Sequence, residues 1–565
     1  MKKSSFIVLV LLLFYSLINF AQTGIEWQKC YAPKSDNSPY DAIKTSDGNF
    51  LIVGAATITT SIPNYWPNNI NGYADLGIML VDSIGNILWK QNYGGNSVEH
   101  AKSVYEDKYR KRYYIAGETK SWEGTTNFHR FPNDTAPKSD AWMICIDSVG
   151  NLLWERCYGN KEGAQTFRSI IQLGDSNKVY ALGQTIGGAN SGDVGYVNSD
   201  TLAHGWREPW LVEIDANNGN FIKSKTYGSS LGAKLFNMTS VDNEKILLVG
   251  YSYSQGGSVW QHYGGTDDGW LIEVDTSLNI SWQKSYGTNS NDGVRDIIIN
   301  HNNEIVLFGR TSANQSDTGT ISVRSAGIGD EIIFIIKLDS LKNEIGQYAY
   351  GYNASGSVFN NWSKQKLVQT ADKGYIMAVN SYQPLGTNYP VGTTEGFSIL
   401  KLDSSFNEVF FRKYGRGIDL GGKGSLLSFL IPTSDNGLII GSGSSPGPFI
   451  PCSQDTAIYG EPGQRYFWWV FKLGANMSIN DNDAAKSNIK VYPNPGQDIF
   501  NIEIANSYKT ANLQVFNSLG QLILDKQQSE NSQNIIFNLQ NHKSGLYLIK
   551  LEIDGEFYTS KIILE

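Results

Sequence analysis

The sequence has little charge, few cysteines and no cluster of like charges. Charged residues make up 18% of the 565 residues, and the formal net charge is −8. Because phosphate backbones are bound by clustered lysine and arginine, an acidic chain without a basic run is not expected to bind nucleic acid. Four cysteines in a chain of this length do not make a disulfide framework.

Long apolar runs are missing after the N-terminus. Residues 1–22 contain Lys2, Lys3, an apolar run from Phe6 to Phe20, and Ala21 before Gln22, which together predict a signal peptide cleaved near Ala21. The run is short for a membrane span, and no later segment could serve as one. We therefore expect a mature chain without a transmembrane segment, in an oxidising compartment where disulfides can form.

Motifs for catalysis and metal binding are missing as well. The six histidines lack a metal-ligand spacing such as HExxH, and no G-x-S-x-G segment precedes a helix. The sequence therefore assigns no catalytic residue, no metal ligand and no cofactor. Whether the protein binds a structural calcium ion stays open, because no motif supports such a site.

The sequence does contain a repeat. The segment DSIGNILWKQNYGG at 82–95 returns in altered form along the chain, and a tyrosine marks each copy. These tyrosines, 59 to 69 residues apart, are Tyr31, Tyr93, Tyr158, Tyr227, Tyr286, Tyr350 and Tyr414. A fixed period found seven times indicates a repeat architecture.

Each period contains four strand signals separated by turns and by one long insert between the second and third strands. The turn before the fourth strand begins with an aspartate in six copies: Asp82, Asp147, Asp215, Asp275, Asp339 and Asp403. We interpret these aspartates as Asx-turn residues rather than calcium ligands. Trp89, Trp154 and Trp282 on the fourth strands are predicted to pack between neighbouring units.

The third strands indicate how the units pack. Several, such as AWMICI at 141–146, are apolar on both faces, and such a sheet must be covered on both sides. Seven four-stranded units packed around an axis give a seven-bladed β-propeller, whereas an open solenoid would need polar capping units. We therefore predict an all-β propeller over residues 23–473.

The ends of the repeat array favour a closed ring. The first unit begins with an orphan fourth strand at 25–31, and the seventh unit has none after FWWVFKL at 467–473. The N-terminal strand is predicted to complete the last blade, which removes exposed strand edges. Closure would place Cys30 and Cys452 in one blade, either as a disulfide or as two free thiols. The hairpin register sets Cys145 and Cys157 apart, so we expect them unbonded.

The C-terminal region has a different pattern. Residues 474–487 are small and polar and are predicted to be a linker, and residues 488–565 contain short alternating strands that predict a small Ig-like β-sandwich. Four segments of this tail share a family pattern: VYPNP at 491–495, VFNSLGQLI at 515–523, GLYLIKL at 545–551 and the terminal KIILE. With these motifs in this order, the tail resembles the C-terminal type A sorting domain of cargo of the Bacteroidetes type IX secretion system.

The resemblance implies a cellular location for the protein. It implies that residues 488–565 interact with the type IX secretion machinery and direct export across the outer membrane, after the signal peptide has directed passage across the inner membrane. The mature chain would then be secreted or attached to the cell surface. Residues 23–473 also resemble the propeller repeats of such surface proteins, which implies a fold but no ligand.

The inserts between second and third strands supply ligand-binding candidates. These loops emerge on one face of the predicted ring, and they carry aromatic residues among polar ones, a combination that holds sugars in many proteins. The candidates are Trp66, Trp122, Trp206, Trp260, Tyr263 and Tyr389. Their alternative role is to pin long loops onto the rim of the propeller.

Three functions remain open from the sequence. The favoured one is a secreted or cell-surface binding module for a glycan or a protein ligand. The second is an enzyme that degrades polysaccharide or peptide, with Glu99, Asp292 and Asp419 as candidate acid and base, although nothing in the sequence selects a pair. The third is a structural or adhesive component of the cell surface.

Overall fold

The chain consists of two compact units that contain only β-strands among the residues described. These units are Met1–Met477 and Ser478–Glu565. The computed structural model describes residues 25–31, 38–57, 66–67, 74–121, 138–160, 163–186, 192–194, 208–324, 331–350, 366–381, 396–415, 426–444, 467–474, 489–493, 496–504, 510–517, 521–529, 534–553 and 556–564.

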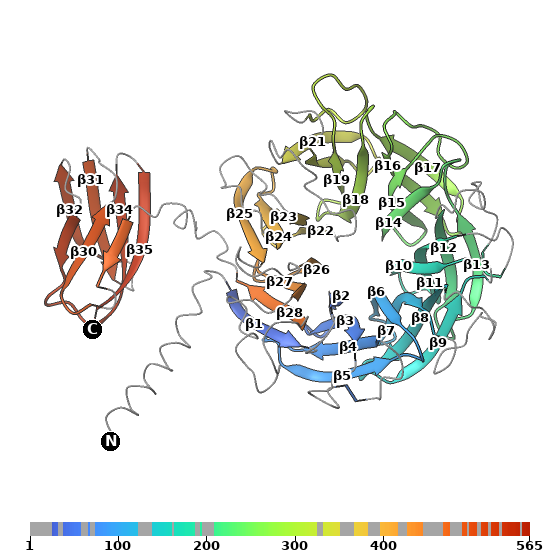
Figure 1. Cartoon of the computed structure of the whole chain (residues 1–565), viewed down its shortest axis with the longest axis horizontal. Helices are drawn as coiled ribbons and strands as arrows, with labels where there is room; N and C mark the ends of the chain where they lie inside the picture. Colours follow the sequence, from blue (N-terminus) through green and yellow to red (C-terminus); the bar gives the residue numbers. More distant parts are fainter. Residues whose placement is uncertain are drawn as a thin grey trace. The chain divides into compact units, whose positions relative to one another are not determined.

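The first unit is a ring of seven four-stranded antiparallel sheets (Figure 1). Blade 1 contains β2 (Pro39–Lys44), β3 (Phe50–Ala56), β4 (Asp75–Val81) and β5 (Ile87–Tyr93). Blade 2 contains β6 (Glu99–Asp107), β7 (Arg112–Thr119), β8 (Asp140–Asp147) and β9 (Leu152–Tyr158). Blade 3 contains β10 (Gln165–Gln172), β11 (Lys178–Thr185), β12 (Glu208–Asp215) and β13 (Phe221–Thr226).

The other four blades repeat this order. Blade 4 contains β14 (Ala233–Ser240), β15 (Lys245–Ser252), β16 (Asp268–Asp275) and β17 (Ile280–Tyr286). Blade 5 contains β18 (Asp292–Ile299), β19 (Ile305–Thr311), β20 (Ile332–Leu338) and β21 (Glu344–Tyr350). Blade 6 contains β22 (Lys366–Gln369), β23 (Tyr375–Ser381), β24 (Gly396–Leu402) and β25 (Glu408–Gly415). Blade 7 contains β26 (Leu426–Pro432), β27 (Leu438–Ser444), β28 (Phe467–Leu473) and β1 (Ile25–Tyr31).

The N-terminal strand closes the ring. β1 pairs antiparallel with β28, with Cys30 opposite Trp469 and Tyr31 opposite Trp468. Round the ring each first strand contacts the first strand of the next blade, and β26 of blade 7 contacts β2 of blade 1. Figure 1 shows these first strands surrounding the centre. The all-β propeller expected from the sequence is therefore confirmed, and its seventh sheet takes its outer strand from the start of the repeat array.

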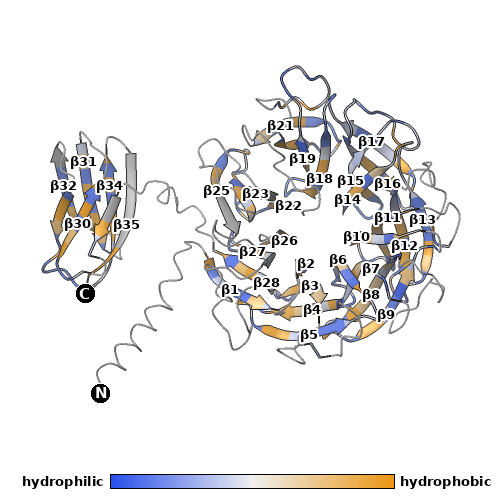
Figure 2. Cartoon of the chain, in the orientation of Figure 1, coloured by the Kyte–Doolittle hydropathy of each residue, from blue (hydrophilic) through white to orange (hydrophobic). Residues whose placement is uncertain are grey.

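The hydrophobic cores of the propeller lie between blades. The described residues form seven buried clusters in this unit, one for each pair of neighbouring blades. Between blades 2 and 3, for example, Met143 packs in the same cluster as Phe167 and Trp210. Figure 2 shows the hydrophobic residues as orange colour along middle strands such as β4 and β8. Each blade thus buries its two apolar faces against two different neighbours.

In five blades the repeat tyrosine joins the fourth strand to the following blade. Its hydroxyl donates to a backbone carbonyl in the turn between the third and fourth strands of that blade. The pairs are Tyr31 with Gly85 (2.5 Å), Tyr93 with Gly150, Tyr158 with Gly219 (2.6 Å), Tyr227 with Leu278 (2.8 Å) and Tyr350 with Phe406 (2.8 Å). The hydroxyl of Tyr286 is buried without a hydrogen-bond partner among the described residues.

The fourth-strand tryptophans add a second contact to the same turns. The indole nitrogens of Trp27, Trp89 and Trp154 donate to the carbonyls of Ser83, Ser148 and Ala216 at 3.0, 3.2 and 3.1 Å. Trp282 packs against the cluster between blades 4 and 5. The predicted packing of fourth-strand tryptophans between blades is confirmed.

The repeat aspartates form Asx turns, as predicted. Asp147 Oδ1 accepts from the backbone N–H groups of Val149 and Asn151 at 3.0 and 2.8 Å, and Asp147 Oδ2 accepts from the Asn151 side chain. Asp82, Asp339 and Asp403 repeat this pattern. Hydrogen bonds to Asn343 hold the pKa of Asp339 below its usual value. These carboxylates shape the turn that receives the tyrosine of the preceding blade.

We expect Tyr158→Phe to destabilise the propeller and Tyr286→Phe to leave it unchanged. Tyr158→Phe leaves the Gly219 carbonyl, buried at the blade junction, without its donor, which costs about 1–2 kcal/mol. Tyr286→Phe removes an equivalent hydroxyl that has no partner, so no loss follows. Urea unfolding of the two variants measures the difference. Equal midpoints would show that the tyrosine bond between blades contributes nothing.

The C-terminal unit is a sandwich of two sheets. One sheet has the order β29 (Ile489–Tyr492), β30 (Ile499–Ile504), β33 (Asn534–Asn538). The other has the order β32 (Leu522–Ser529), β31 (Thr510–Asn517), β34 (Gly545–Ile553), β35 (Glu556–Leu564). A single core holds alternate residues of both sheets, such as Phe500, Phe537, Leu513 and Leu551. In the described residues of the whole chain, no helix has the length and apolarity to cross a membrane.

Candidate functional site

Trp66, predicted to be an exposed ligand platform, is instead buried. Only 4% of its surface is exposed, and its ring centroid lies 5.8 Å from that of Trp468 in blade 7. Space for the indole exists because Gly77 has no side chain: a Cβ there would lie 2.7 Å from Trp66 Cη2. The interpretation of Trp66 as a ligand contact is wrong, and the residue fills the core between blades 7 and 1.

The other insert aromatics divide into exposed residues and residues outside the described part of the chain. Trp260 is 68% exposed, and its backbone N–H donates to Gln283 Oε1 at 3.3 Å. Tyr263 is half-buried, and its backbone N–H donates to Asp268 Oδ2. Trp122, Trp206 and Tyr389 lie outside the described residues. Of the three described candidates, Trp66 is buried, while Trp260 and Tyr263 keep exposed or half-exposed side chains, so a ligand role for these two and for the three undescribed residues remains a prediction.

The three described cysteines agree with the prediction that Cys145 and Cys157 are unbonded and that Cys30 can form a disulfide. Cys145 and Cys157 are buried free thiols, opposite Trp154 and Trp142 in the hairpin of blade 2. Cys30 is disulfide-bonded. Cys452, its expected partner, lies outside the described residues, so the pairing remains a prediction.

The two described carboxylates considered for catalysis, Glu99 and Asp292, do not form a pair. Glu99 and Asp292 are each fully buried, and they lie at different junctions, between blades 1 and 2 and between blades 4 and 5. Glu99 Oε1 accepts from the hydroxyls of Thr119 (2.7 Å) and Ser121, while Asp292 Oδ2 accepts from the backbone N–H (2.6 Å) and hydroxyl (2.8 Å) of Thr288. Asp419 lies outside the described residues. Both described carboxylates are thus engaged in fixing the start of a first strand.

Two junctions bury a second carboxylate beside the first. Asp75, at the start of β4, faces Glu99, and a Cβ on Gly94 would lie 2.6 Å from both Asp75 Oδ1 and Glu99 Oε2. Burial, and in addition the charge of Glu99, raise the pKa of Asp75 to about 7. Burial and the charge of Asp292 likewise raise the pKa of Asp268 to about 7. The glycine after the repeat tyrosine leaves room for these pairs.

No larger ligand set surrounds them. The described residues contain no group of three or more histidine, cysteine, aspartate or glutamate side chains arranged to hold a metal ion. Asp75 Oδ2 accepts from Asn92 Nδ2 at 2.9 Å, while Asp75 Oδ1 has no hydrogen-bond partner among the described residues. Asp75 Oδ1 is therefore a buried acceptor that lies beside the Glu99 carboxylate without a donor among the described residues.

This pair predicts a stability that falls as pH rises. Since the folded chain binds the Asp75 proton more tightly than the unfolded chain does, the free energy of unfolding decreases between about pH 4 and pH 7. In Asp75→Asn the amide oxygen can keep the bond from Asn92, and its nitrogen can donate to Glu99. We expect this variant to be more stable than wild type at pH 8, on the order of 2 kcal/mol, and similar to wild type at pH 4.

Urea unfolding at the two pH values measures this effect. The matched control is Asp147→Asn, whose carboxylate has a lowered pKa because it accepts turn hydrogen bonds, so it gives no gain at pH 8. A loss of stability at pH 8 in Asp75→Asn would contradict the raised pKa of Asp75.

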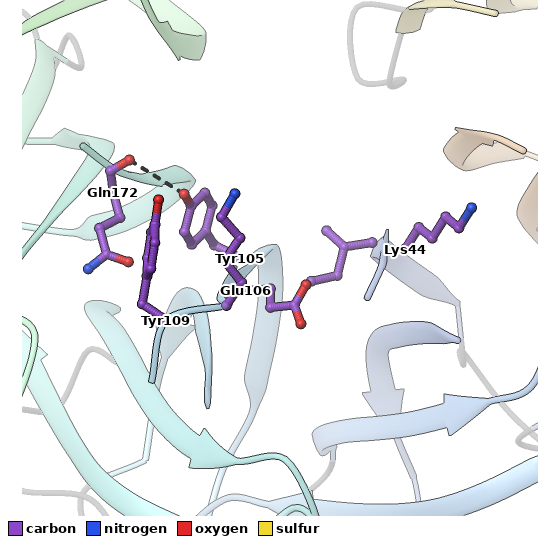
Figure 3. Close-up of a pocket in the computed structure, with 7 residues that line it drawn as sticks. Lys44, Tyr105, Glu106, Tyr109 and Gln172 are labelled. Atoms are coloured by element: carbon purple, nitrogen blue, oxygen red, sulfur yellow. Dashed lines mark hydrogen bonds between the residues drawn. The ribbon is translucent and has the colours of Figure 1, made fainter. Parts of the chain in front are cut away.

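The described part of the propeller contains a cavity of about 240 Å³ near its axis (Figure 3). It lies where the first strands of blades 1, 2 and 3 end, and is lined by Ile43, Lys44, Tyr105, Glu106, Lys108, Tyr109 and Gln172. Tyr109 is 54% exposed, and Lys108 Nζ lies 5.3 Å from the centroid of its ring. We call this cavity the tyrosine pocket. Because the inserts leave from the opposite ends of these strands, it lies at the other end of the ring from the predicted site.

The tyrosine pocket is held by contacts between three blades. The Ser46 backbone N–H and hydroxyl donate to Glu106, which ties the first turn of blade 1 to blade 2. Arg110 binds Asp107 on its own blade at 3.2 Å and reaches Asp175 (3.0 Å) and Asn177 (2.7 Å) on blade 3. The Tyr105 hydroxyl lies 3.4 Å from the Gln172 carbonyl. Tyr109 therefore sits on a turn that is anchored before any ligand arrives.

Sequence reasoning missed this pocket because it searched the long inserts. The turn EDKYRKR at 106–112 puts an aromatic residue among six charged ones, whereas the matching turns of the other blades contain no phenylalanine, tyrosine or tryptophan. An aromatic residue in a turn that needs none is a signal that could have identified it.

Comparisons with known proteins bear on the tail and on the fold. Residues 490–565 match the family model described as secretion system C-terminal sorting domain. A search of curated proteins found no match.

Solved structures of three proteins resemble the chain, each with a TM-score of 0.36. A quinohemoprotein alcohol dehydrogenase from Pseudomonas putida HK5 is 8% identical over 84% of this chain and 78% of its own. The Dos1 propeller is 10% identical over 74% and 92%, and an α-L-arabinofuranosidase from Fusarium graminearum 9% over 81% and 99%. At these identities and scores nothing about function follows for this chain.

The match of residues 490–565 agrees with the motifs VYPNP, VFNSLGQLI and GLYLIKL in the sandwich. A sorting tail of this kind implies export to the cell surface or the extracellular space. The chain is a type IX secretion cargo, in which a C-terminal sorting domain follows a β-propeller.

Proposed function

We propose that the protein is a glycan-binding module of the cell surface or the secreted fraction, and that the tyrosine pocket holds a sugar residue. The observation that carries this proposal is the pairing of two tyrosines with polar groups in one cavity near the axis. Aromatic faces pack against the apolar face of a sugar ring, and amide, ammonium and carboxylate groups at the rim bond its hydroxyls.

The pocket favours binding over hydrolysis. Glycoside hydrolysis uses two carboxyl groups on either side of the scissile bond. Glu106 is the single carboxylate among the residues that line the pocket, and both its oxygens already accept hydrogen bonds from Ser46. Polysaccharide or peptide cleavage and a purely structural role remain the alternative hypotheses, without an observation in the described residues that favours either.

The anchoring of the pocket supports affinity. The turn that carries Tyr109 is fixed by Arg110 to blade 3, so little loop entropy is lost on binding. Because the Tyr109 ring is exposed, its removal by mutation leaves no cavity in a hydrophobic core. A loss of binding in such a variant can therefore be assigned to the ring itself.

We expect Tyr109→Ala to weaken glycan binding about tenfold or more, with unchanged thermal stability. The protein is first screened against a glycan array, with and without calcium, and the strongest hit is then titrated. Trp260→Ala is the matched control, because Trp260 is also exposed but lies in an insert of blade 4. Loss of binding in Trp260→Ala but not in Tyr109→Ala would move the site to the insert face. If the protein bound no glycan on the array, a protein ligand or a structural role would be favoured.

Export is proposed to depend on both ends of the chain, with residues 1–22 as the signal peptide. We expect removal of residues 490–565 to leave a folded propeller that stays inside the outer membrane, since the propeller forms its own compact unit. Cell fractionation and protease accessibility measure the location. Normal surface display of the truncated chain would contradict a sorting role for the tail.

A further inference from the structure

Every outer strand of the propeller begins with a β-bulge. Where the fourth strand of a blade pairs with the third, the register shifts by one residue directly after the first residue of the fourth strand. The extra residue is exposed in all seven blades. These residues are Glu26, Leu88, Leu153, Ile222, Ser281, Ile345 and Val409. A bulge re-aims a side chain and interrupts a strand edge, which accounts for the exposure of this position.

The seven repeats provide an internal comparison at the first two positions of the outer strand. Blades 1, 2 and 3 place large apolar residues at both positions: Ile87 and Leu88, Leu152 and Leu153, Phe221 and Ile222. Each of the other four blades has a polar residue at one of them, namely Ser281, Glu344, Glu408 or Glu26. Because the bulge forms equally with serine or glutamate, the fold itself does not require the apolar pairs.

The turns between blades connect the apolar pairs of blades 1–3. The turn before β9 lies on β5, since the Trp89 indole donates to the Ser148 carbonyl at 3.2 Å. The turn before β13 lies on β9 in the same way, through the Trp154 indole and the Ala216 carbonyl at 3.1 Å. Figure 1 shows β5, β9 and β13 following one another on the outside of the ring.

The turns add two further exposed apolar residues to these pairs, one in blade 1 and one in blade 2. The outer apolar patch, as we call the resulting surface, consists of Ile84, Ile87, Leu88, Val149, Leu152, Leu153, Phe221 and Ile222.

The outer apolar patch is larger than a monomer normally exposes. Its residues are each between 36% and 61% exposed. At these fractions they offer roughly 700 Å² of apolar surface, whereas the largest apolar patch of a typical monomer is about 300–600 Å². Apolar side chains on exposed edge strands also promote association between chains. We therefore expect this surface to be covered.

The chemistry of the patch suits a second copy of itself. A two-fold contact brings the same surface of both partners together, so a charged surface would face its own charge. None of the eight residues is ionisable. A stable interface buries about 800 Å² from each partner, of which roughly 60% is apolar, so the area of the patch is sufficient for a dimer.

We propose that two copies of the chain associate through the outer apolar patch around a two-fold axis. Blade 2 lies between blades 1 and 3, so Val149, Leu152 and Leu153 form the centre of the contact. The contact removes the eight side chains from water and covers three strand edges. This inference does not depend on glycan binding, because the tyrosine pocket lies near the axis and the patch lies on outer strands.

Sedimentation velocity over a range of protein concentrations tests the proposal on residues 23–565, the chain expected after removal of the signal peptide. We expect the wild-type chain to sediment as a dimer at micromolar concentration. Leu152→Glu copies Glu344 and Glu408, which occupy the same position in blades 5 and 6. Because it brings a charge from each copy into the contact, we expect the dimer dissociation constant to rise about tenfold or more.

Two further variants control for charge and for folding. Val409→Glu is the matched control, because Val409 is an exposed aliphatic residue at the bulge of blade 6, outside the patch, and we expect it to leave the dimer unchanged. Leu153→Ser copies Ser281 of blade 4 and weakens the contact without adding charge. It keeps the test valid where thermal melting shows that Leu152→Glu is unfolded.

The outcomes either support the outer apolar patch as the contact or overturn it. Weakening of the dimer in Leu152→Glu and Leu153→Ser but not in Val409→Glu would support it. A monomer at every concentration would overturn the proposal, and flotation with phosphatidylcholine vesicles would then show whether the patch binds a lipid surface instead. A dimer that persists in both patch variants, or that Val409→Glu weakens equally, would place the contact elsewhere and also overturn it.

Discussion

The propeller depends on contacts that no blade can make alone. Every core of this unit in the described residues lies between two blades, and five repeat tyrosines donate their hydroxyls to a turn of the next blade. A single four-stranded sheet would leave two apolar faces in water. Stability is therefore a property of the junctions, each of which combines apolar faces from two neighbouring blades.

Function is built from the residues that the junctions do not use. The first strands lie at the centre of the ring, and their buried residues serve the cores, while bulges and turn ends release other side chains. The tyrosine pocket uses a turn that departs from the common repeat. It is a deviation from a regular scaffold, which is where binding groups can vary without loss of the fold.

The sequence predicted the propeller well because each repeat of the sequence corresponds to one blade. The strand at 25–31 lies in the repeat pattern without a third strand before it, and the seventh repeat lacks a fourth strand after 467–473; together these two features predict closure of the ring. The roles of Asp147 and Trp154 were predicted correctly. Asp147 acts within its own turn, and Trp154 recurs at the same position of several repeats. The sorting tail could be read because several motifs occur in order.

The sites were harder to predict because their signals are spatial. Trp66 has the appearance of an exposed loop residue, yet a glycine on β4 and Trp468 from the far end of the repeat array create its cavity. Glycines in the second strands, such as Gly117, are visible in the sequence, but the bulge that they permit appears only when two strands are paired. Asp75 and Glu99 meet across a junction between blades, which periodicity alone does not reveal.

The pairing of β1 with β28 can form only when the whole repeat array is present. The indole of Trp469 donates to Gln28 across 441 positions, so the first strand to be synthesised finds its partner only after all seven repeats exist. Contacts of such long range form late because the intervening chain must already be ordered. A chain that stops early leaves β1 without a partner strand and at least one blade open-edged. Closure therefore pairs strand edges that an incomplete chain would leave exposed and open to aggregation.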